Sequence, residues 1–358
     1  MAALAKGVNL SGWYAQLAPD KERFKNYIQP EDIKLLSRLG CRHARVIIEP
    51  RVLMTNKDPS VLDVENLKLF DASLDMILAG KLAVMICPYY DDKSKWQVLT
   101  DATAARAFGA FWGALAKHVS ARDPDMVFLQ VMNEPSTNDQ TLWNNLQACL
   151  VGRIRRAAPG NTIVAVSNMR ANGNWDLIGG LEQLQPVKDP NVVYDFHFYD
   201  PVQFTHQGAT WMTPQVAHYK DLPYPSSVEA IQPFLKGIKD DSARSFAALY
   251  GRERWGRERI DRQIKRAANW ARRFKAPIIC SEFGCYRQNT PADGRNRYLR
   301  DVRETLEKYG IGWTHWDYVG DFGIVTVKDG KRVLDKDTAG ALGLSADLPT
   351  TATAPAAP

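Results

Sequence analysis

The feature that most constrains the fold of this chain is a unit repeated eight times, in which a short apolar run precedes a loop and an amphipathic segment. The apolar runs are rich in Val, Ile and aromatic residues and mostly lack alternation, which is typical of strands buried on both faces. The segments between them carry apolar residues at helical spacing, as in Phe108, Phe111 and Leu115. Strict alternation requires parallel strands, and eight such units close most naturally into a (β/α)8 barrel. The predicted strands are residues 7–13, 43–49, 82–88, 126–133, 162–168, 192–199, 277–283 and 311–317.

An open, doubly wound sheet is the competing architecture. It would usually bring a glycine-rich phosphate loop after its first strand, and GVNLSGWYAQ lacks that pattern. We therefore expect one barrel over residues 1–344, followed by a flexible Ala/Pro/Thr-rich tail over residues 345–358. About sixty residues, 200–259, separate the sixth predicted strand from its helix, and insertions of this length tend to be lids or substrate walls.

Composition excludes several classes of protein. No apolar stretch approaches the roughly 18 residues that span a bilayer, and no export signal is visible at the start, although a removed signal would leave the same picture. Five cysteines, an odd number, argue against a complete disulfide framework. The net charge is +6, and the densest basic stretch, residues 252–275, is interleaved with acids, as in a solvated helical face. The sequence therefore predicts neither a nucleic-acid nor a membrane partner, and it leaves the oligomeric state open.

Two acids stand where predicted strands end. The fourth strand ends MVFLQVMNEPS, where Pro135 cannot continue a central strand and Glu134 is left at its edge. The seventh ends ICSEFG, which places Glu282 at the corresponding position. Either acid alone could be an ordinary polar residue at a turn. In a parallel barrel, however, both project onto one rim, and a pair of carboxylates there is what glycosidic cleavage requires.

Other strand ends add polar and aromatic side chains to the same rim. The second strand carries Arg45, which could keep a nearby carboxylate ionised. The sixth ends with His197 and Tyr199 on one side, and the eighth presents Trp316, a flat surface for a sugar ring. Each could simply be a satisfied core residue, but together on one rim they favour a functional site.

At this point the sequence resembles glycoside hydrolase family 5, the cellulase family of retaining (β/α)8 enzymes. The resemblance runs from Gly7 to about Gly343 and rests on an ordered set of motifs, ARVIIEP, VMNEPS, HFYDP, SEFG and THWDY. It implies an endo-acting β-1,4-glucanase that needs no cofactor or metal, takes a β-glucan polysaccharide or oligosaccharide as substrate, and is secreted or periplasmic. The six histidines also lack the H-x-x-x-H and H-x-H spacings of metal sites.

The resemblance implies a role for each rim residue. Glu134 would be the acid/base and Glu282 the nucleophile, with Arg45 and Tyr199 holding Glu282. We therefore expect the carboxyl groups about 5–5.5 Å apart, the pKa of Glu282 lowered and that of Glu134 raised.

The remaining roles concern the sugar. Asn133 would hydrogen-bond the 2-hydroxyl, His197 would orient the acid side, and Trp316 would floor the cleavage subsite. Tyr89 is a departure, since many members carry a histidine there, and it is a candidate substrate contact in this chain. We expect a groove open at both ends and lined by Trp316 together with some of Trp13, Trp96, Trp175, Trp211 and Trp255.

Three alternatives stay open. The first two are a mannanase and a β-1,3-glucan-active enzyme of the same family. The third is a carbohydrate-binding barrel without turnover, although a pure binder has no need of paired acids.

Overall fold

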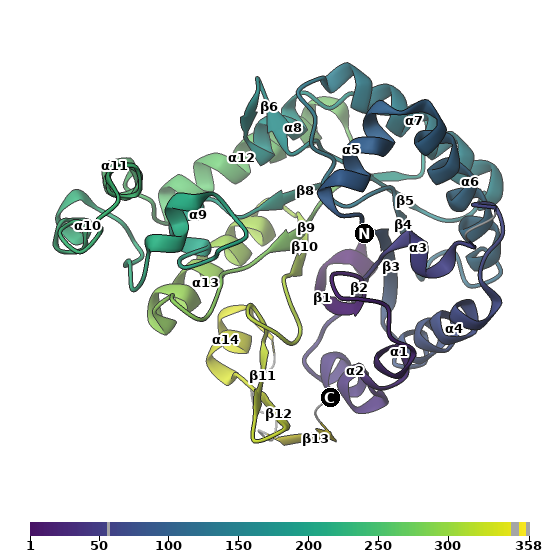
Figure 1. Ribbon diagram of the computed structural model, residues 1–358, viewed down its shortest axis with the longest axis horizontal. Helices are drawn as coiled ribbons and strands as arrows, with labels where there is room; N and C mark the ends of the chain where they lie inside the picture. Colours follow the sequence, from purple (N-terminus) through teal and green to yellow (C-terminus); the bar gives the residue numbers. More distant parts are fainter. Residues whose placement is uncertain (56–57, 345–350, 356–358) are drawn as a thin grey trace.

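Eight parallel strands form a closed barrel at the centre of the molecule (Figure 1). The computed structural model describes residues 1–55, 58–344 and 351–355. The (β/α)8 prediction is confirmed, because the first and last barrel strands pair with each other and leave no open sheet edge. In order around the barrel the strands are β1 (Lys6–Tyr14), β2 (His43–Ile48), β3 (Ala83–Pro88), β4 (Val127–Gln130), β5 (Ile163–Val166), β8 (Val192–Phe198), β9 (Ile278–Phe283) and β10 (Gly312–His315).

Helices surround the barrel and return the chain from the end of one strand to the start of the next (Figure 1). Aspartates fix where many of them begin; Asp63, Asp101 and Asp139, for example, each accept a hydrogen bond from a backbone N–H in the first turn. The surrounding helices are α1 (Lys21–Asn26), α2 (Pro30–Arg38), α3 (Pro50–Leu53), α4 (Val64–Ala79), α5 (Asp92–Thr100), α6 (Ala102–Val119), α7 (Gln140–Ala157), α8 (Leu177–Glu182), α12 (Arg257–Phe274), α13 (Ala292–Lys308) and α14 (Lys336–Ala341).

The core has a shell between strands and helices and a separate filling inside the barrel. The predicted helical stripe of Phe108, Phe111 and Leu115 is buried in the outer shell. Leu4, in the short 3-10 helix η1 (Ala2–Leu4), belongs to an apolar cluster contributed by strands β3, β4, β5, β8 and β9. A smaller apolar cluster of Ala15, Ile47 and Cys87 lies against Tyr89 and Trp316. Apolar side chains thus fill part of the barrel interior, and buried polar residues such as Asn9, Arg45 and Gln130 occupy another part.

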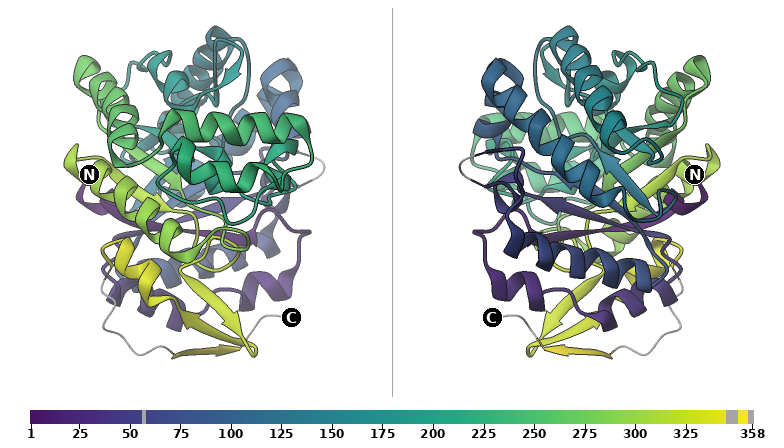
Figure 2. Two further views of the ribbon diagram at one scale, coloured as in Figure 1. Left: turned by 90° about the vertical axis from the view of Figure 1, so that its left-hand side faces the viewer. Right: turned by 90° about the vertical axis from the view of Figure 1, so that its right-hand side faces the viewer.

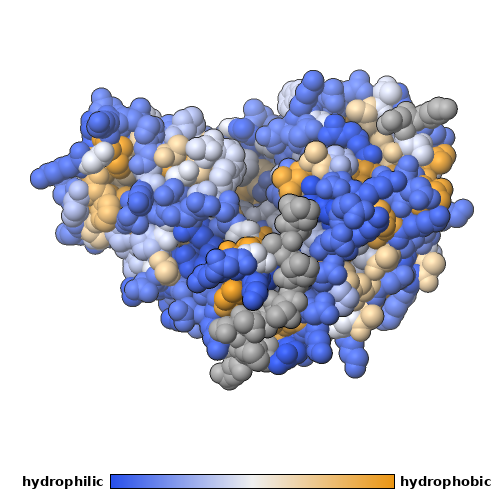
Figure 3. Space-filling model, turned by 60° about the horizontal axis from the view of Figure 1, so that its bottom comes forward, coloured by the Kyte–Doolittle hydropathy of each residue, from blue (hydrophilic) through white to orange (hydrophobic). Residues whose placement is uncertain are grey.

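The insertion after β8 is largely helical. It contains α9 (Val202–Thr205), the 3-10 helix η2 (Pro214–His218), α10 (Val228–Leu235) and α11 (Asp241–Glu253). Helices α10 and α11 pack on each other and stand out beside the barrel, at the left of Figures 1 and 3. We call α10 and α11 the helical arm. The insertion predicted at this place is confirmed, and the stretch expected to be a loop has helical structure of its own.

Two small antiparallel sheets decorate the barrel. One is a hairpin of β6 (Arg170–Ala171) and β7 (Asn174–Trp175). The other joins β11 (Val325–Lys328), β12 (Lys331–Leu334) and β13 (Thr351–Pro355) at the bottom of the views in Figure 2. Residues 345–350 and 356–358 of the predicted tail lie outside the described residues. None of the described helices has the length and apolar character needed to cross a membrane.

Candidate active site

The predicted rim residues come together at the C-terminal ends of the barrel strands. Glu282 lies in β9 beside His197 of β8, with which it is in register. Glu134 has a positive φ of 46°, a backbone conformation that is uncommon for residues other than glycine. Strand β4 ends at Gln130, so Glu134 lies in the segment that follows this strand.

Arg45 is fully buried and organises one side of the site. Its guanidinium donates to Glu282 Oε1 at 2.6 Å and to Asn133 Oδ1 at 2.8 Å. It also donates to Asn9 Oδ1 at 2.7 Å and to Gln130 Oε1 at 2.6 Å. A buried cation needs partners of this kind, and four acceptors hold it rigidly beneath the carboxylate of Glu282.

The second oxygen of Glu282 is held by Tyr199, whose hydroxyl donates to Oε2 at 2.9 Å. Burial and the neighbouring charge of Glu282 raise the pKa of Tyr199 well above its usual value, so this hydroxyl keeps its proton. Arg45 and Tyr199 therefore each donate to one oxygen of Glu282, the arrangement that the family resemblance implied.

His197 lies between the two acids. Its Nδ1 is 3.0 Å from Glu134 Oε1 and 3.5 Å from Glu282 Oε2. Its Nε2 is 3.2 Å from Ser281 Oγ and 3.5 Å from Asp195 Oδ2. Burial lowers the pKa of His197, but the charge of Glu282 and the contacts with Asp195 and Glu134 outweigh it and raise the pKa to about 10. The imidazole is therefore protonated at neutral pH.

The carboxylates of Glu134 and Glu282 face each other, with one oxygen of each within 4.8 Å of the other. Burial raises the pKa of Glu282, and the positive charges of His197 and Arg45 oppose that shift. Burial also acts to raise the pKa of Glu134, but the hydrogen bond and charge of His197 overcome it and lower the pKa to about 2. Both directions expected from the sequence are thus wrong for the substrate-free site. Burial outweighs the nearby positive charges and raises the pKa of Glu282, whereas protonated His197 lowers that of Glu134.

Glu134, His197 and Glu282 also form the one group among the described residues whose atoms could converge on a metal ion. Their donor atoms are already engaged. Arg45 and Tyr199 take both oxygens of Glu282, and Glu134 and Ser281 take the two nitrogens of His197. A metal ion would have to displace these hydrogen bonds, since it requires a neutral imidazole and free carboxylate oxygens.

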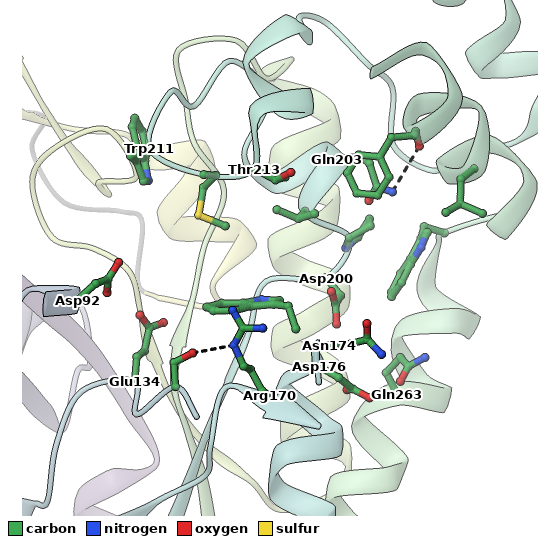
Figure 4. A pocket seen from close by; sticks show the side chains of 18 of the residues that line it. Asp92, Glu134, Arg170, Asn174, Asp176, Asp200, Gln203, Trp211, Thr213 and Gln263 are labelled. Carbon is green, nitrogen blue, oxygen red and sulfur yellow. Dashed lines mark hydrogen bonds between the residues drawn. The ribbon is translucent and has the colours of Figure 1, made fainter. Parts of the chain in front are cut away.

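Two solvent-open cavities meet at Glu134. The smaller cavity, of about 480 Å³, is lined by Asn133, Tyr199, Glu282 and Trp316. The larger cavity, of about 1080 Å³, is lined by Glu134 but by neither Glu282 nor Trp316 (Figure 4). The two share several lining residues, namely Tyr89, Glu134, Trp175, Asp200, Val202, Trp211 and Met212. Together they make a cleft that continues on both sides of the carboxylate pair.

The tryptophans divide as expected between cleft and core. Trp175 and Trp211 line both cavities, and Trp96 and Trp255 line the larger one. Trp13 does not line the cleft, because it is buried and donates from Nε1 to the Phe24 carbonyl. The helical arm contributes Phe246, Leu249 and Glu253 to the larger cavity, so the insertion forms a wall of the cleft.

A layer of polar residues beneath the acids was not predicted from the sequence. Asn9 and Gln130 hold Arg45, and Asp195 accepts from Gln130 Nε2 at 2.6 Å and from the Ser281 backbone N–H at 2.8 Å. Each of four apolar strands carries a polar residue in its interior. Because a buried polar group requires hydrogen-bond partners, these residues were a signal that such a layer exists.

Comparisons with known proteins place these motifs in a family. The family model described as "Cellulase (glycosyl hydrolase family 5)" matches residues 3–321. Endoglucanase 3 of Fibrobacter succinogenes is 27% identical over 364 residues, which cover 96% of this chain and 53% of that protein, so the chain spans about half its length. Endoglucanase C of Acetivibrio thermocellus is 25% identical over 89% of this chain and 92% of its own.

Solved structures share the fold. Thermotoga maritima Cel5A, in a structure described as a complex with mannotriose substrate, superposes with a TM-score of 0.74 at 22% identity, over 95% of this chain and 97% of that one. The family model covers most of the chain and includes both acids. The chain therefore belongs to glycosyl hydrolase family 5, the cellulase family, and is a glycoside hydrolase.

Proposed function

We propose that this protein is an endo-acting, retaining β-1,4-glucanase that cleaves cellulose or related β-glucans by double displacement. The observation that carries the proposal is the carboxylate pair, with oxygens of Glu134 and Glu282 within 4.8 Å. Retaining enzymes hold the two carboxyl groups about 5–5.5 Å apart, whereas inverting enzymes keep them roughly 6.5–9.5 Å apart to admit a water molecule. An oxygen pair this close favours the retaining arrangement over the inverting one.

Glu282 is the proposed nucleophile. Arg45 and Tyr199 occupy one lone pair on each oxygen and fix the carboxylate in the smaller cavity. Rigid placement of this kind lowers the entropic cost of attack on the anomeric carbon. Attack forms a glycosyl ester with Glu282 and breaks the bond to the leaving oxygen.

Glu134 is the proposed acid/base. His197 Nδ1 lies 3.0 Å from Glu134 Oε1 and orients this carboxyl group, and a bound sugar displaces water from Glu134, which raises its pKa so that it takes up a proton. Glu134 then protonates the leaving oxygen as the bond breaks. In the second step Glu134 removes a proton from water, which attacks the anomeric carbon and releases Glu282.

Three other side chains would hold the sugar being cleaved. Asn133 accepts from Arg45 through Oδ1, which leaves its amide group to donate to a sugar hydroxyl. Trp316 is partly buried against the apolar cluster below it and offers its remaining face to a sugar ring. Tyr89 packs on the same cluster and lines both cavities, where its hydroxyl can meet the sugar in place of the usual histidine.

The endo mode is supported by the cleft, which continues on both sides of the acids. A polymeric β-glucan cannot cross a membrane intact, so we also propose that the enzyme acts outside the cytoplasm. A second candidate substrate is β-mannan, favoured by the mannotriose in the Thermotoga maritima structure. A β-1,3-glucan remains the third candidate within the family.

The test is a side-by-side assay of carboxymethylcellulose, mannan and laminarin with the wild-type enzyme and with the Glu134→Gln and Glu282→Gln variants. We expect carboxymethylcellulose to be cleaved fastest, with viscosity falling well before reducing ends accumulate, and both variants to lose activity by several orders of magnitude. NMR of the first products should show the β-anomer. Initial release of the α-anomer would refute the retaining mechanism. A single product size from cellopentaose would refute the endo mode.

A further inference from the structure

The larger cavity leads from Glu134 to a second group of polar side chains. Asn174 of β7, Asp176 before α8, Asp200 after β8 and Gln263 of α12 lie together in this cavity, apart from Glu134 (Figure 4). Of the four, Asp200 also lines the smaller cavity. We call these four residues the polar recess. Four separate elements supply them, so the fold itself brings their polar groups together.

The carboxylate of Asp200 can accept further hydrogen bonds in this recess. Its backbone carbonyl accepts from the Tyr298 hydroxyl at 3.2 Å, but among the residues that the structure describes none donates to its carboxylate. Burial raises the pKa of Asp200 to about 6, and the charges of Asp176 and Glu253 add to the shift against those of Arg266 and Arg259. Asp200 is only partly exposed and lines the cavity, so a ligand hydroxyl there can supply a hydrogen bond that no described side chain supplies.

The neighbouring acids are already engaged. Asp176 caps α8 by accepting from the Gly179 backbone N–H at 2.7 Å. Glu253 accepts from Trp255 Nε1 at 2.9 Å and from Arg259 at 2.9 Å. Asp200 is therefore the acid of this region whose carboxylate is left for a ligand.

The direction of the substrate follows from the two acids. The nucleophile Glu282 lines the smaller cavity, so the sugar that becomes bound to the enzyme lies there. Glu134 protonates the leaving oxygen and lines the larger cavity without Glu282, so the departing chain extends into that cavity. The larger cavity has a volume of about 1080 Å³, compared with about 480 Å³ for the smaller one. The larger cavity therefore has room for several sugar residues or for a side branch.

We propose that the polar recess binds a sugar residue of the departing chain and that Asp200, by accepting hydrogen bonds from its hydroxyls, is a specificity-determining residue. This inference rests on the proposed function. The sugar is either the next residue of the main chain or a single-sugar branch on it, since both present the same hydroxyl donors. Gln263 assists, because its Oε1 accepts from Arg266 at 2.7 Å while its amide group is left to face the recess.

The test compares leaving groups with and without sugar hydroxyls. Wild type, Asp200→Ala and Asp200→Asn are assayed with an aryl β-cellobioside, with cellopentaose and with a β-1,4-glucan oligosaccharide that carries single-sugar branches. We expect Asp200→Ala to lose about tenfold more kcat/KM on at least one oligosaccharide than on the aryl glycoside. Asp200→Asn should recover part of that loss. Loss on cellopentaose assigns the main chain, and loss confined to the branched substrate assigns the branch.

Asp301→Asn is the matched control. Asp301 is also a buried acid with a raised pKa, but its carboxylate accepts from Tyr224 at 2.8 Å and lines neither cavity. This variant should keep the ratio of the two kcat/KM values within about twofold of wild type. If Asp200→Ala does not fold, Gln263→Ala gives the same comparison with a smaller expected loss.

Two results would overturn the inference. Equal losses on aryl and sugar leaving groups would make Asp200 a structural residue, and no loss on either oligosaccharide would leave the recess without a sugar. Both differ from failure of the proposed function, in which the wild-type enzyme itself would cleave neither the aryl cellobioside nor cellopentaose.

Discussion

Replacing Arg45 by Met should lower the stability of the folded protein and also shift the pH dependence of its activity. Arg45 has no exposed surface, and its ion pair with Glu282 is correspondingly buried. Methionine keeps much of the apolar volume but removes the charge and four hydrogen-bond donations to Glu282, Asn133, Asn9 and Gln130. Glu282 is then left with less positive charge in a buried environment.

The magnitude follows from that burial. Breaking a buried ion pair by removing one partner costs about 3–5 kcal/mol, because the other charge stays desolvated. Arg45 opposes the rise that burial causes in the pKa of Glu282, so without it the folded-state pKa rises further. A raised folded pKa means that the folded state holds the proton more tightly. The destabilisation should therefore be small in acid and grow as pH rises through the pKa of Glu282.

The assay measures thermal unfolding between pH 4 and pH 8 (roughly the range over which a carboxyl of raised pKa titrates) and the pH profile of kcat/KM. The acid limb should move to higher pH, because Glu282 must be ionised to attack. Arg332→Met is the matched control, since Arg332 forms a similarly buried ion pair with Asp32 and neither residue lines the cleft. The Arg332→Met variant should lose a similar amount of stability, while the acid limb of its kcat/KM pH profile stays where it is in wild type.

A double variant refines the test. Adding Glu282→Gln to Arg45→Met removes the stranded charge and should restore roughly half of the lost stability. If Arg45→Met is as stable as wild type at pH 8, or if Glu282→Gln makes it less stable still, the electrostatic account of this site is wrong.

The fold was predictable because its signal is local. Each strand is a mostly apolar run, such as residues 82–88, and each helix carries its own apolar stripe. The position of Glu134 and Glu282 on one rim followed from strand direction alone, since parallel strands end on the same side. No distance in space was needed for either inference.

The protonation states were not predictable in the same way. They depend on His197 lying 3.0 Å from one acid and 3.5 Å from the other, which no sequence pattern encodes. The pairing of Arg45 with Asn9 and Gln130 likewise depends on barrel register. The polar recess was missed because Asp200 and Gln263 meet only through the packing of α12 against the barrel.

Three further predictions address single residues. In the Glu134→Ala variant, substrates with good leaving groups should keep much of their first-step rate, and added azide should speed turnover and give a β-glycosyl azide. Azide rescue of Glu282→Ala with retained configuration would instead mean that the two roles are reversed. Trp316→Ala should raise the activation free energy from kcat/KM on cellopentaose by roughly 1–3 kcal/mol, and a change below about twofold would show that it does not stack on the reacting sugar. The last prediction concerns Asp317, which is buried, accepts from the Ser11 hydroxyl and has a second oxygen with no partner among the described residues. Burial raises its pKa from 3.8 to about 7. The folded state therefore holds a proton that the unfolded chain releases, and stability falls as pH rises between these values, by about 4 kcal/mol at about 1.4 kcal/mol per pKa unit. The side-chain amide of the Asp317→Asn variant cannot ionise. The Tm of this variant should therefore rise relative to that of wild type from pH 5 to pH 8 (roughly spanning the raised pKa). A Tm difference independent of pH would contradict the assignment of a neutral Asp317.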